Sequence, residues 1–239
     1  MPEVIEAVLF DLDGTLADTA PDMALTVNRM LERRGRAPVP IDAVRPHVSK
    51  GARGMIGAAF GLAPDDDGFQ ALREEFLELY GENLCVGTRL FPGMESLLDE
   101  LEAAGVLWGV VTNKFERFAR PLIDALGLAH RAGIVVGGDT CPRPKPFPDP
   151  LLFAAAHLGV APMRTLYVGD DERDVQAARA AGMPVLVAGY GYLGDGAPPI
   201  LWGADGIVES APAIGAWMRE RAAEMRRQDS STQPTKGHP

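Results

Sequence analysis

The stretch Val8-Leu-Phe-Asp-Leu-Asp-Gly-Thr-Leu16 decides the fold prediction, because an apolar run leads directly into two aspartates spaced one residue apart. The expected strand, Val4–Phe10, places Asp11 and Asp13 at its carboxyl end, where open α/β sheets bind their ligands. The two carboxylates can converge on one ion if the chain turns at Gly14. A plain Asp-Gly turn is the alternative, since both residues are common in turns. The Gly-Thr-Leu that follows the pair favours a functional site.

Composition narrows the class of protein. The chain has 239 residues, 46% of them apolar, which is enough to bury the core of one large domain or two smaller ones. Its net charge of −10 argues against a nucleic-acid partner. Two cysteines, Cys85 and Cys141, are too few for a disulfide framework and fit a reducing compartment. No apolar stretch approaches the roughly 20 residues that span a bilayer, so we expect a cytoplasmic protein without a membrane partner.

Short apolar runs alternate with helical patterns along most of the chain, which predicts an α/β fold with a parallel sheet covered by helices on both faces. The expected strands are Val4–Phe10, Val106–Thr112, Ile134–Val136, Thr165–Val168, Pro184–Ala188 and Ile207–Val208. The expected helices of this part are Gly93–Ala104, Glu116–Leu126, Pro150–Leu158, Glu172–Ala181 and Ile214–Arg226.

One long segment breaks this alternation. From Asp18 to Phe91 the sequence shows no convincing strand, and its helical patterns lie at Pro21–Arg34, Ala52–Phe60 and Phe69–Asn83. We therefore predict a helical insertion, residues 17–91, in a core domain made of residues 1–16 and 92–227. The last segment, 228–239, is rich in Ser, Thr, Gln, Pro and Gly and is predicted to be disordered.

Two further elements follow expected strands at the same edge as Asp11. Thr112 and Asn113 offer a hydroxyl and an amide, which can donate hydrogen bonds to a phosphoryl oxygen or simply begin the next helix. Lys145 lies in a loop with five prolines, which restrict its backbone. Its ammonium is either a fixed point charge for a phosphate or for crowded carboxylates, or a solvated charge on a stiff surface loop.

The fourth element is the acidic run Asp170-Asp171-Glu172-Arg173-Asp174. Negative charge suits the first turn of the next helix, which explains Asp171 and Glu172. It does not explain Asp170, a carboxylate that follows a buried strand at the same edge as Asp11. Carboxylates crowded at one edge repel each other unless a cation joins them, and Mg²⁺ prefers such oxygen ligands.

Together, these four elements resemble the signature motifs of the haloacid dehalogenase (HAD) superfamily. The matching residues are Asp11-x-Asp13-Gly-Thr-Leu, Thr112, Lys145-Pro and Gly169-Asp170-x-x-x-Asp174. The resemblance covers nearly the whole chain and implies a Rossmann-like core with an inserted helical cap of the C1 type at residues 17–91. It also implies a Mg²⁺-dependent phosphatase that uses an aspartyl-phosphate intermediate.

The resemblance implies a role for each acidic residue. Asp11 would attack phosphorus, and Asp13 would protonate the leaving group and then activate water. Mg²⁺ would be held by the Asp11 carboxylate, the Asp13 backbone carbonyl and Asp170. Asp174 would orient water or the motif lysine, and whether it or Asp171 touches the metal is left open.

The same resemblance implies a phosphoryl-binding set made of Thr112, the Asn113 backbone amide and Lys145. Asp13 separates phosphatases from dehalogenases, since a departing halide needs no proton and the dehalogenase branch lacks this aspartate. Two alternatives stay open on this core. One is a sugar-phosphate mutase or other phosphotransferase, and the other is a non-catalytic binding module.

Two groups within the superfamily share further segments with this chain. Val135–Asp139 and Tyr190-Gly-Tyr192 are similar to phosphoglycolate phosphatases. Ser49–Met55, Trp108–Lys114 and Trp202–Asp205 are similar to N-acetylmuramic acid 6-phosphate phosphatases. Because the cap is expected to select the substrate, its likeness to the second group carries more weight.

The substrate implied is a small phosphorylated metabolite that bears a carboxylate. In the cap, Arg53 is the predicted specificity residue, because a guanidinium can bind a carboxylate through two hydrogen bonds, and a solvated charge at a helix end is its alternative. Lys50 and His47 are weaker candidates for the same contact. We expect a monomer or a homodimer.

Overall fold

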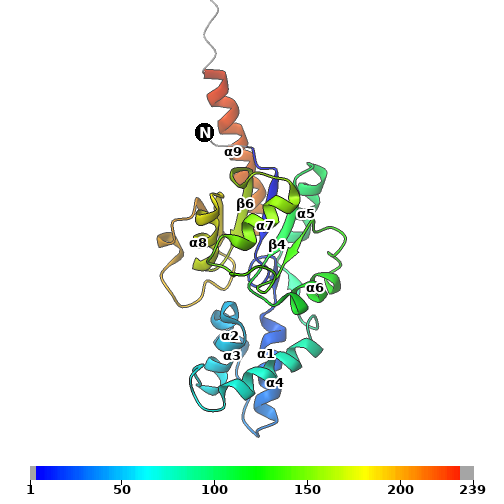
Figure 1. The fold of residues 1–239 in the computed structure, drawn as a ribbon, viewed down its shortest axis with the longest axis vertical. Coiled ribbons are helices and arrows are strands. Elements are labelled where there is room, and N and C mark those ends of the chain that lie inside the picture. The colour runs from blue at the N-terminus through cyan, green and yellow to red at the C-terminus, as the bar shows by residue number, and fades with distance from the viewer. Residues whose placement is uncertain (1–3, 232–239) are drawn as a thin grey trace, which may run out of the picture.

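The computed structural model describes residues 4–231 as an α/β core with a helical cap at one end (Figure 1). The core is built on a six-stranded parallel sheet in the order β5-β4-β1-β6-β7-β8. Its strands are β1 (Ala7–Phe10), β4 (Leu107–Val111), β5 (Val135–Val136), β6 (Thr165–Gly169), β7 (Val185–Ala188) and β8 (Gly206–Val208). The first strand lies between two half-sheets that extend in opposite directions, which is the doubly wound, Rossmann-like order. The predicted fold class is therefore confirmed.

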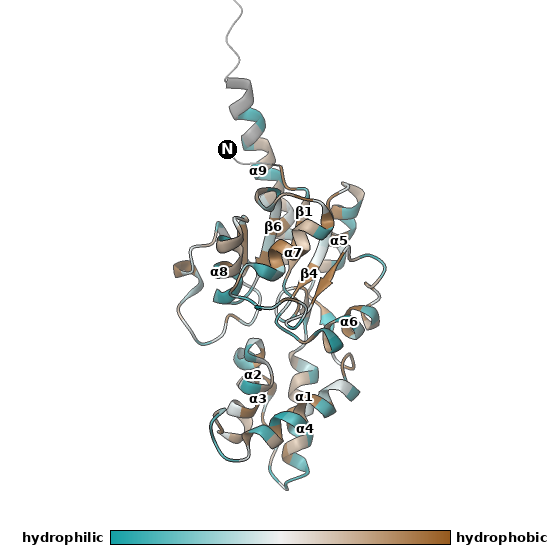
Figure 2. Cartoon of the chain, viewed as in Figure 1, coloured by the Kyte–Doolittle hydropathy of each residue, from teal (hydrophilic) through white to brown (hydrophobic). Residues whose placement is uncertain are grey.

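Helices cover both faces of this sheet. They are α5 (Met94–Ala103), α6 (Glu116–Ala125), α7 (Asp149–Leu158), α8 (Glu172–Ala181) and α9 (Ala211–Ser231), with short 3₁₀ turns at Pro162–Arg164 and Pro199–Leu201. Successive strand side chains point to opposite faces. In β1, Phe10 packs in a cluster with α5, α6 and α9, whereas Leu9 packs in a cluster with α7 and α8. With both faces covered, the strands are mostly apolar (Figure 2), as parallel strands usually are.

The cap has a hydrophobic core of its own. Its helices are α1 (Ala20–Glu32), α2 (Ile41–Val44), α3 (Gly51–Phe60) and α4 (Phe69–Glu82), with a 3₁₀ turn at Arg45–Lys50 before α3. Apolar residues of these helices form one cluster, which also takes in Phe118 and Tyr192 from the core. The cap is thus seated on the core through apolar contacts.

The two chain crossings between core and cap pair with each other. Strand β2 (Ala17–Asp18) runs antiparallel to β3 (Arg89–Leu90). The predicted absence of strands in the insertion is wrong at these two points, because strands of two residues carry no alternating pattern and are defined only by their pairing. Buried Asp22 of α1 braces the return crossing, accepting hydrogen bonds from the backbone of Gly87 (2.6 Å) and from the backbone and hydroxyl of Thr88 (2.9 and 2.6 Å).

The last helix is longer than predicted. Helix α9 continues to Ser231, so residues 228–231 of the segment predicted to be disordered are helical, and that boundary is wrong. No proline or glycine lies between Arg219 and Ser231 to end the helix. The rest of that segment, 232–239, lies outside the described residues. Across residues 4–231, we find no helix with the length and apolar character needed to cross a bilayer.

Candidate active site

The chain turns sharply where β1 ends. The backbone N–H of Leu16 donates to the carbonyl of Asp11 (3.2 Å), and Gly14 has a φ of +90°. A Cβ atom at Gly14 would lie only 2.1 Å from an oxygen of Asp170. Glycine is therefore required at this position for two reasons: the left-handed backbone and the close approach of a carboxylate.

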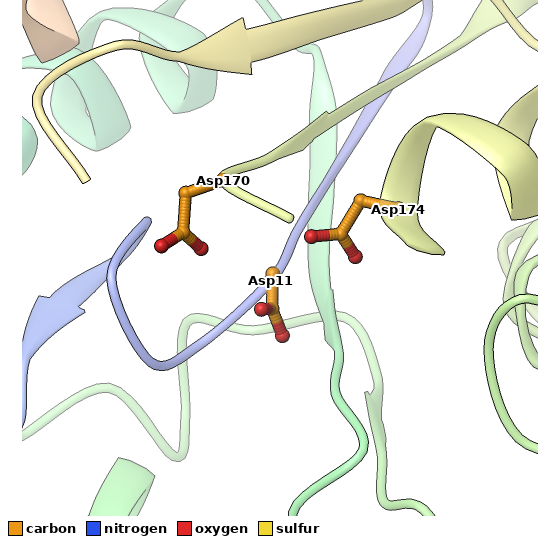
Figure 3. A group of neighbouring side chains, drawn as sticks. All are labelled: Asp11, Asp170 and Asp174. Atoms are coloured by element: carbon orange, nitrogen blue, oxygen red, sulfur yellow. The ribbon is translucent and has the colours of Figure 1, made fainter. Parts of the chain in front are cut away.

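Three buried carboxylates meet at this edge of the sheet (Figure 3). Asp11 follows β1, Asp170 follows β6, and Asp174 lies in the first turn of α8. One oxygen of each lies within 4.8 Å of the others, and none of the three residues is more than 8% exposed. The structure thus brings Asp11 of the first sequence element together with Asp170 and Asp174 of the fourth, as predicted.

Burial and mutual repulsion act on these groups in the absence of a cation. Burial raises the pKa of Asp11 to about 6, against the opposing charge of Lys145. Burial, together with the charges of Asp11 and Asp174, holds the pKa of Asp170 well above its usual range. Asp170 is fixed in direction, because its oxygens accept hydrogen bonds from the Thr15 hydroxyl (3.1 Å) and from a backbone amide (2.8 Å).

Lys145 is part of this cluster rather than a solvated surface lysine. It is 4% exposed, and its ammonium lies 2.6 Å from Asp174 Oδ1 and 2.9 Å from Asp11 Oδ1. The same nitrogen contacts the Tyr167 hydroxyl (2.9 Å) and the carbonyl of Val111 (3.1 Å). Despite burial, the adjacent carboxylates raise the pKa of Lys145, so the site holds a permanent positive charge beside Asp11.

The loop after β4 is tied to the lysine loop. The Asn113 side chain donates to the carbonyl of Lys145 (2.9 Å) and accepts from its amide (3.0 Å). Buried Thr112 accepts a hydrogen bond from the Lys114 amide (3.1 Å), which leaves its own hydroxyl proton available. A Cβ atom at Gly138 would meet the carbonyl oxygen of Asn113 at 2.3 Å, so the glycines after β5 permit this packing. The Asn113 side chain therefore positions Lys145, a role that the sequence did not indicate.

Asp13 is not one of the three clustered carboxylates. Its Oδ1 accepts hydrogen bonds from the Thr19 hydroxyl (2.6 Å) and from the Lys114 ammonium (2.7 Å). Although burial opposes it, the charge of Asp13 raises the pKa of Lys114. Sequence reasoning missed Lys114 as a site residue, and its place directly after Thr112 and Asn113 was the available signal.

The donor set suits a hard divalent cation. Asp11 Oδ1 is buried without a well-aligned hydrogen bond, and no described residue donates to the Asp13 carbonyl. Asp174 has both oxygens engaged, by Lys145 and Tyr167 on one side and by a backbone amide on the other. Three buried carboxylates whose oxygens lie within 4.8 Å of one another could hold a metal ion.

Asp171 of the fourth element has a structural role. Asp171 is the N-cap of α8 and accepts from the backbone and the guanidinium of Arg173. Those hydrogen bonds lower the pKa of Asp171, although its burial acts the other way. Arg173 also donates to the carbonyl of Ser49 in the cap (2.8 Å), so the pair joins the core to the cap.

A cavity of about 260 Å³ lies between this edge and the cap. Its core wall includes Asp11, Asp13, Thr112, Asn113, Lys114 and Lys145. Its cap wall is cationic in one part, with Lys50, Arg53 and Arg73, and apolar in another, with Met23, Val48, Phe76, Leu77 and Tyr80. The structure therefore brings most of the core residues predicted for the site to the wall of one cavity, and Asp170 lies behind them, within 4.8 Å of Asp11 and Asp174.

The predicted cap residues differ in where they lie. Arg53 lines the cavity, exposed and without an ion pair among residues 4–231, and so does half-buried Arg73, which the sequence analysis did not identify. A single arginine on an amphipathic helix carries no signal of its own in the sequence. Lys50 also lines the cavity, but its ammonium pairs with Asp195 of the core (2.5 Å). His47 is half-buried and is not among the residues of the cavity wall.

A doubly wound sheet with buried carboxylates and a lysine at its carboxyl edge, under a helical cap, has the features of an α/β enzyme with a small-molecule site. Residues 8–188 match the family model described as haloacid dehalogenase-like hydrolase. The chain belongs to that family and is a hydrolase, which confirms the resemblance drawn from its motifs.

Close relatives and solved structures support this assignment. The chain is 49% identical over 215 residues to a phosphoglycolate phosphatase of Xanthomonas campestris pv. campestris, covering 88% of this chain and 96% of the relative. It is 46% identical over 205 residues to an N-acetylmuramic acid 6-phosphate phosphatase of Pseudomonas aeruginosa, covering 86% and 91%. A crystal structure of a predicted phosphoglycolate phosphatase from Haemophilus somnus superimposes with a TM-score of 0.78 at 30% identity, covering 90% and 98%. CbbY from Rhodobacter sphaeroides, crystallised with phosphate, gives a TM-score of 0.69 at 25% identity, covering 88% and 96%.

Proposed function

We propose that this protein is a Mg²⁺-dependent phosphatase that hydrolyses a small phosphate monoester through an aspartyl phosphate on Asp11. One observation carries the proposal: the buried Asp11 carboxylate lies between Asp170 and the ammonium of Lys145, which pairs with its Oδ1 at 2.9 Å. That arrangement provides a nucleophile, room for a cation and a fixed positive charge for a phosphoryl group in one place.

The first half of the reaction transfers the phosphoryl group to the protein. A carboxylate oxygen of Asp11 attacks phosphorus, and the bond from phosphorus to the ester oxygen breaks. Asp13 gives its proton to the departing oxygen, which leaves as an alcohol. In the second half, Asp13 takes a proton from a water molecule, which attacks the aspartyl phosphate and releases inorganic phosphate and the free Asp11 carboxylate.

Electrostatics and positioning supply most of the rate enhancement expected for such a reaction. The ammonium of Lys145, the free hydroxyl proton of Thr112 and the Asn113 amide are the donors available for the phosphoryl oxygens. Mg²⁺, held by Asp11, Asp170 and the Asp13 carbonyl, would neutralise negative charge on the transferring group. Asp174 keeps Lys145 in position through its 2.6 Å ion pair.

The cap walls of the cavity point to the substrate class. Arg53 and Arg73, which have no ion pair within residues 4–231, favour a substrate with a second anionic group, such as a carboxylate. The apolar wall that includes Phe76 and Tyr80 favours a body larger than that of glycolate, because two carbons leave most of that wall without contact. Between the substrates in the names of the relatives, this supports N-acetylmuramic acid 6-phosphate, with 2-phosphoglycolate as the second candidate.

The proposal also includes a cytoplasmic location and hydrolysis, rather than transfer of the phosphoryl group to a second molecule. Both cysteines are free thiols, which supports a reducing compartment such as the cytoplasm. Relatives named as phosphatases favour hydrolysis over transfer to a second sugar.

A phosphate-release screen tests the proposal. It compares kcat/KM for N-acetylmuramic acid 6-phosphate, 2-phosphoglycolate and hexose phosphates, with Mg²⁺ and with excess chelator. We expect turnover only with the metal, and loss of turnover in Asp11→Asn without loss of fold. Isomerised phosphosugar in place of free phosphate would indicate a mutase, and full activity of Asp11→Asn would refute the nucleophile.

A further inference from the structure

Lys114 is a buried cation with no part in the mechanism above. Its side chain is 7% exposed, and its ammonium lies 2.7 Å from Asp13 Oδ1. The backbone of this residue is fixed on both sides: its amide donates to Thr112 Oγ1 (3.1 Å), and its carbonyl accepts from Gly138 (2.8 Å). The loop thus presents the ammonium to Asp13 from a rigid support.

The cap supplies the other side of this contact. The Lys114 ammonium lies 4.8 Å from the ring centroid of Tyr80, within the range of a cation–π interaction. Tyr80 is 2% exposed, stacks on Phe76 at 5.9 Å and meets Phe118 of the core edge-on at 5.7 Å. Lys114 is therefore enclosed between the Asp13 carboxylate of the core and an aromatic wall of the cap.

These contacts fix the orientation of the Asp13 side chain. The Lys114 ammonium donates to Oδ1, and the Thr19 hydroxyl donates to the same oxygen at 2.6 Å. A carboxylate held in this way is in place to take the proton from the attacking water in the second half of the reaction. Tyr80 removes solvent from the ion pair only while the cap is seated, which makes the pair stronger in the closed site.

We propose that Lys114 is a positioning residue that holds Asp13 as the base for hydrolysis of the aspartyl phosphate, and that Tyr80 makes this hold depend on cap closure. The inference rests on the proposed role of Asp13. It separates the two halves of the reaction, since phosphorylation of Asp11 by an ester with a good leaving group needs neither Asp13 nor Lys114.

The test uses Lys114→Met with p-nitrophenyl phosphate, whose leaving phenolate needs no proton. We expect kcat to fall by about 10- to 100-fold, a part of the usual contribution of acid–base catalysis. KM falls with it, so kcat/KM stays near the wild-type value, and a rapid burst of p-nitrophenolate precedes slow turnover because the phosphoenzyme accumulates. Lys114→Arg restores part of kcat.

Two further variants connect the effect to Asp13 and to the cap. In an Asp13→Asn background, Lys114→Met produces no additional loss of kcat, because both changes remove the same function. Tyr80→Leu also lowers kcat, but by a smaller factor than Lys114→Met. Tyr80→Phe keeps the ring, and its kcat stays near the wild-type value. Arg120→Met, which removes a charge from α6 outside the cavity, is the matched control and leaves the kinetics unchanged.

Each contrary result has a definite meaning. A raised KM with unchanged kcat would assign Lys114 to substrate binding and overturn the proposal. A loss of kcat/KM without a burst, or a loss that adds to that of Asp13→Asn, would also overturn it, with thermal unfolding showing whether the variant is folded. Failure of the proposed function is recognised separately, as wild-type protein that releases no phosphate or an Asp11→Asn variant that still does.

Discussion

The side-chain amide of Asn113 and the backbone of Lys145 exchange two hydrogen bonds, of 2.9 and 3.0 Å, across 32 residues of sequence. The pair joins the loop after β4 to the proline-rich loop before α7. It fixes the backbone from which the Lys145 side chain reaches Asp11 and Asp174. Asn113 thus acts on the site through the lysine, whatever its own backbone amide contacts.

Replacing Asn113 with alanine should leave Lys145 loosely held. We expect Asn113→Ala to lower kcat/KM by up to about 10²-fold, because small displacements of a positioning group have effects of that size. Asn28→Ala is the matched control, since Asn28 makes the same two hydrogen bonds with the backbone of Val39 inside the cap (3.0 and 2.8 Å). Both variants should lose similar stability in thermal unfolding, and equal losses of activity would contradict a role specific to Lys145.

Gly14 should tolerate no side chain. Gly14→Ala places a methyl group 2.1 Å from Asp170 Oδ2 at a φ of +90°, so the carboxylate has to move, and we expect loss of metal-dependent activity. Gly35→Ala provides the control, because Gly35 also has a positive φ (+65°) but no atom within 4 Å of a new Cβ. Gly35→Ala should cost only the backbone strain, about 1–2 kcal/mol. Retained turnover in Gly14→Ala would mean that Asp170 can shift without consequence.

The core of this protein was predictable because its signals are local and repeated. Each of the six sheet strands carries a continuous apolar run, as expected for a sheet buried on both faces. Asp11, Thr112 and Asp170 directly follow three such strands, and parallel strands bring those ends to one edge. The sequence therefore predicted that these three side chains would lie at the same edge of the sheet.

Pairwise contacts around the cavity could not be predicted in the same way. Lys114 reaches Asp13 across 101 residues, and nothing in the composition of either segment specifies that ion pair. Arg73 has the spacing of any solvated charge on an amphipathic helix, and only the seating of α4 over the core brings it to the cavity. His47 shows the reverse case, since its short distance in sequence from Lys50 did not bring it to the same wall.

Magnesium should stabilise the protein more at high pH than at low pH. Burial raises the pKa of Asp11 to about 6 in the metal-free protein, above its ordinary value of 3.8. A carboxyl group with a raised pKa gives its full stability below the unfolded value, and that stability is lost as pH rises through 6. Metal binding requires the charged carboxylate, so it opposes this loss only at the higher pH.

The measurement is the Tm with and without excess MgCl₂ at pH values on either side of 6. We expect a clear increase in Tm above pH 6 and little or none below it. Asp11→Asn should abolish the increase, whereas Asp99→Asn, which removes an exposed carboxylate on α5, should retain it. An increase of equal size at both pH values would show that Mg²⁺ binds elsewhere or that Asp11 is charged throughout.

Arg53 and Arg73 should select substrates that carry a second anion. Both line the cavity from the cap and have no ion pair in the part of the chain that the structure describes, so a substrate carboxylate is their available partner. We expect Arg53→Met and Arg73→Met each to raise KM by roughly 10- to 100-fold for a carboxylate-bearing phosphate, the value of a hydrogen bond to a charged group. KM for a neutral hexose phosphate should change little.

Arg33→Met is the control, because Arg33 carries the same charge in the cap but pairs with Glu75 at the surface. If Arg33→Met raises KM as much, the effect comes from the net charge of the cap, and if both substrates respond equally, the two arginines bind the phosphoryl group instead.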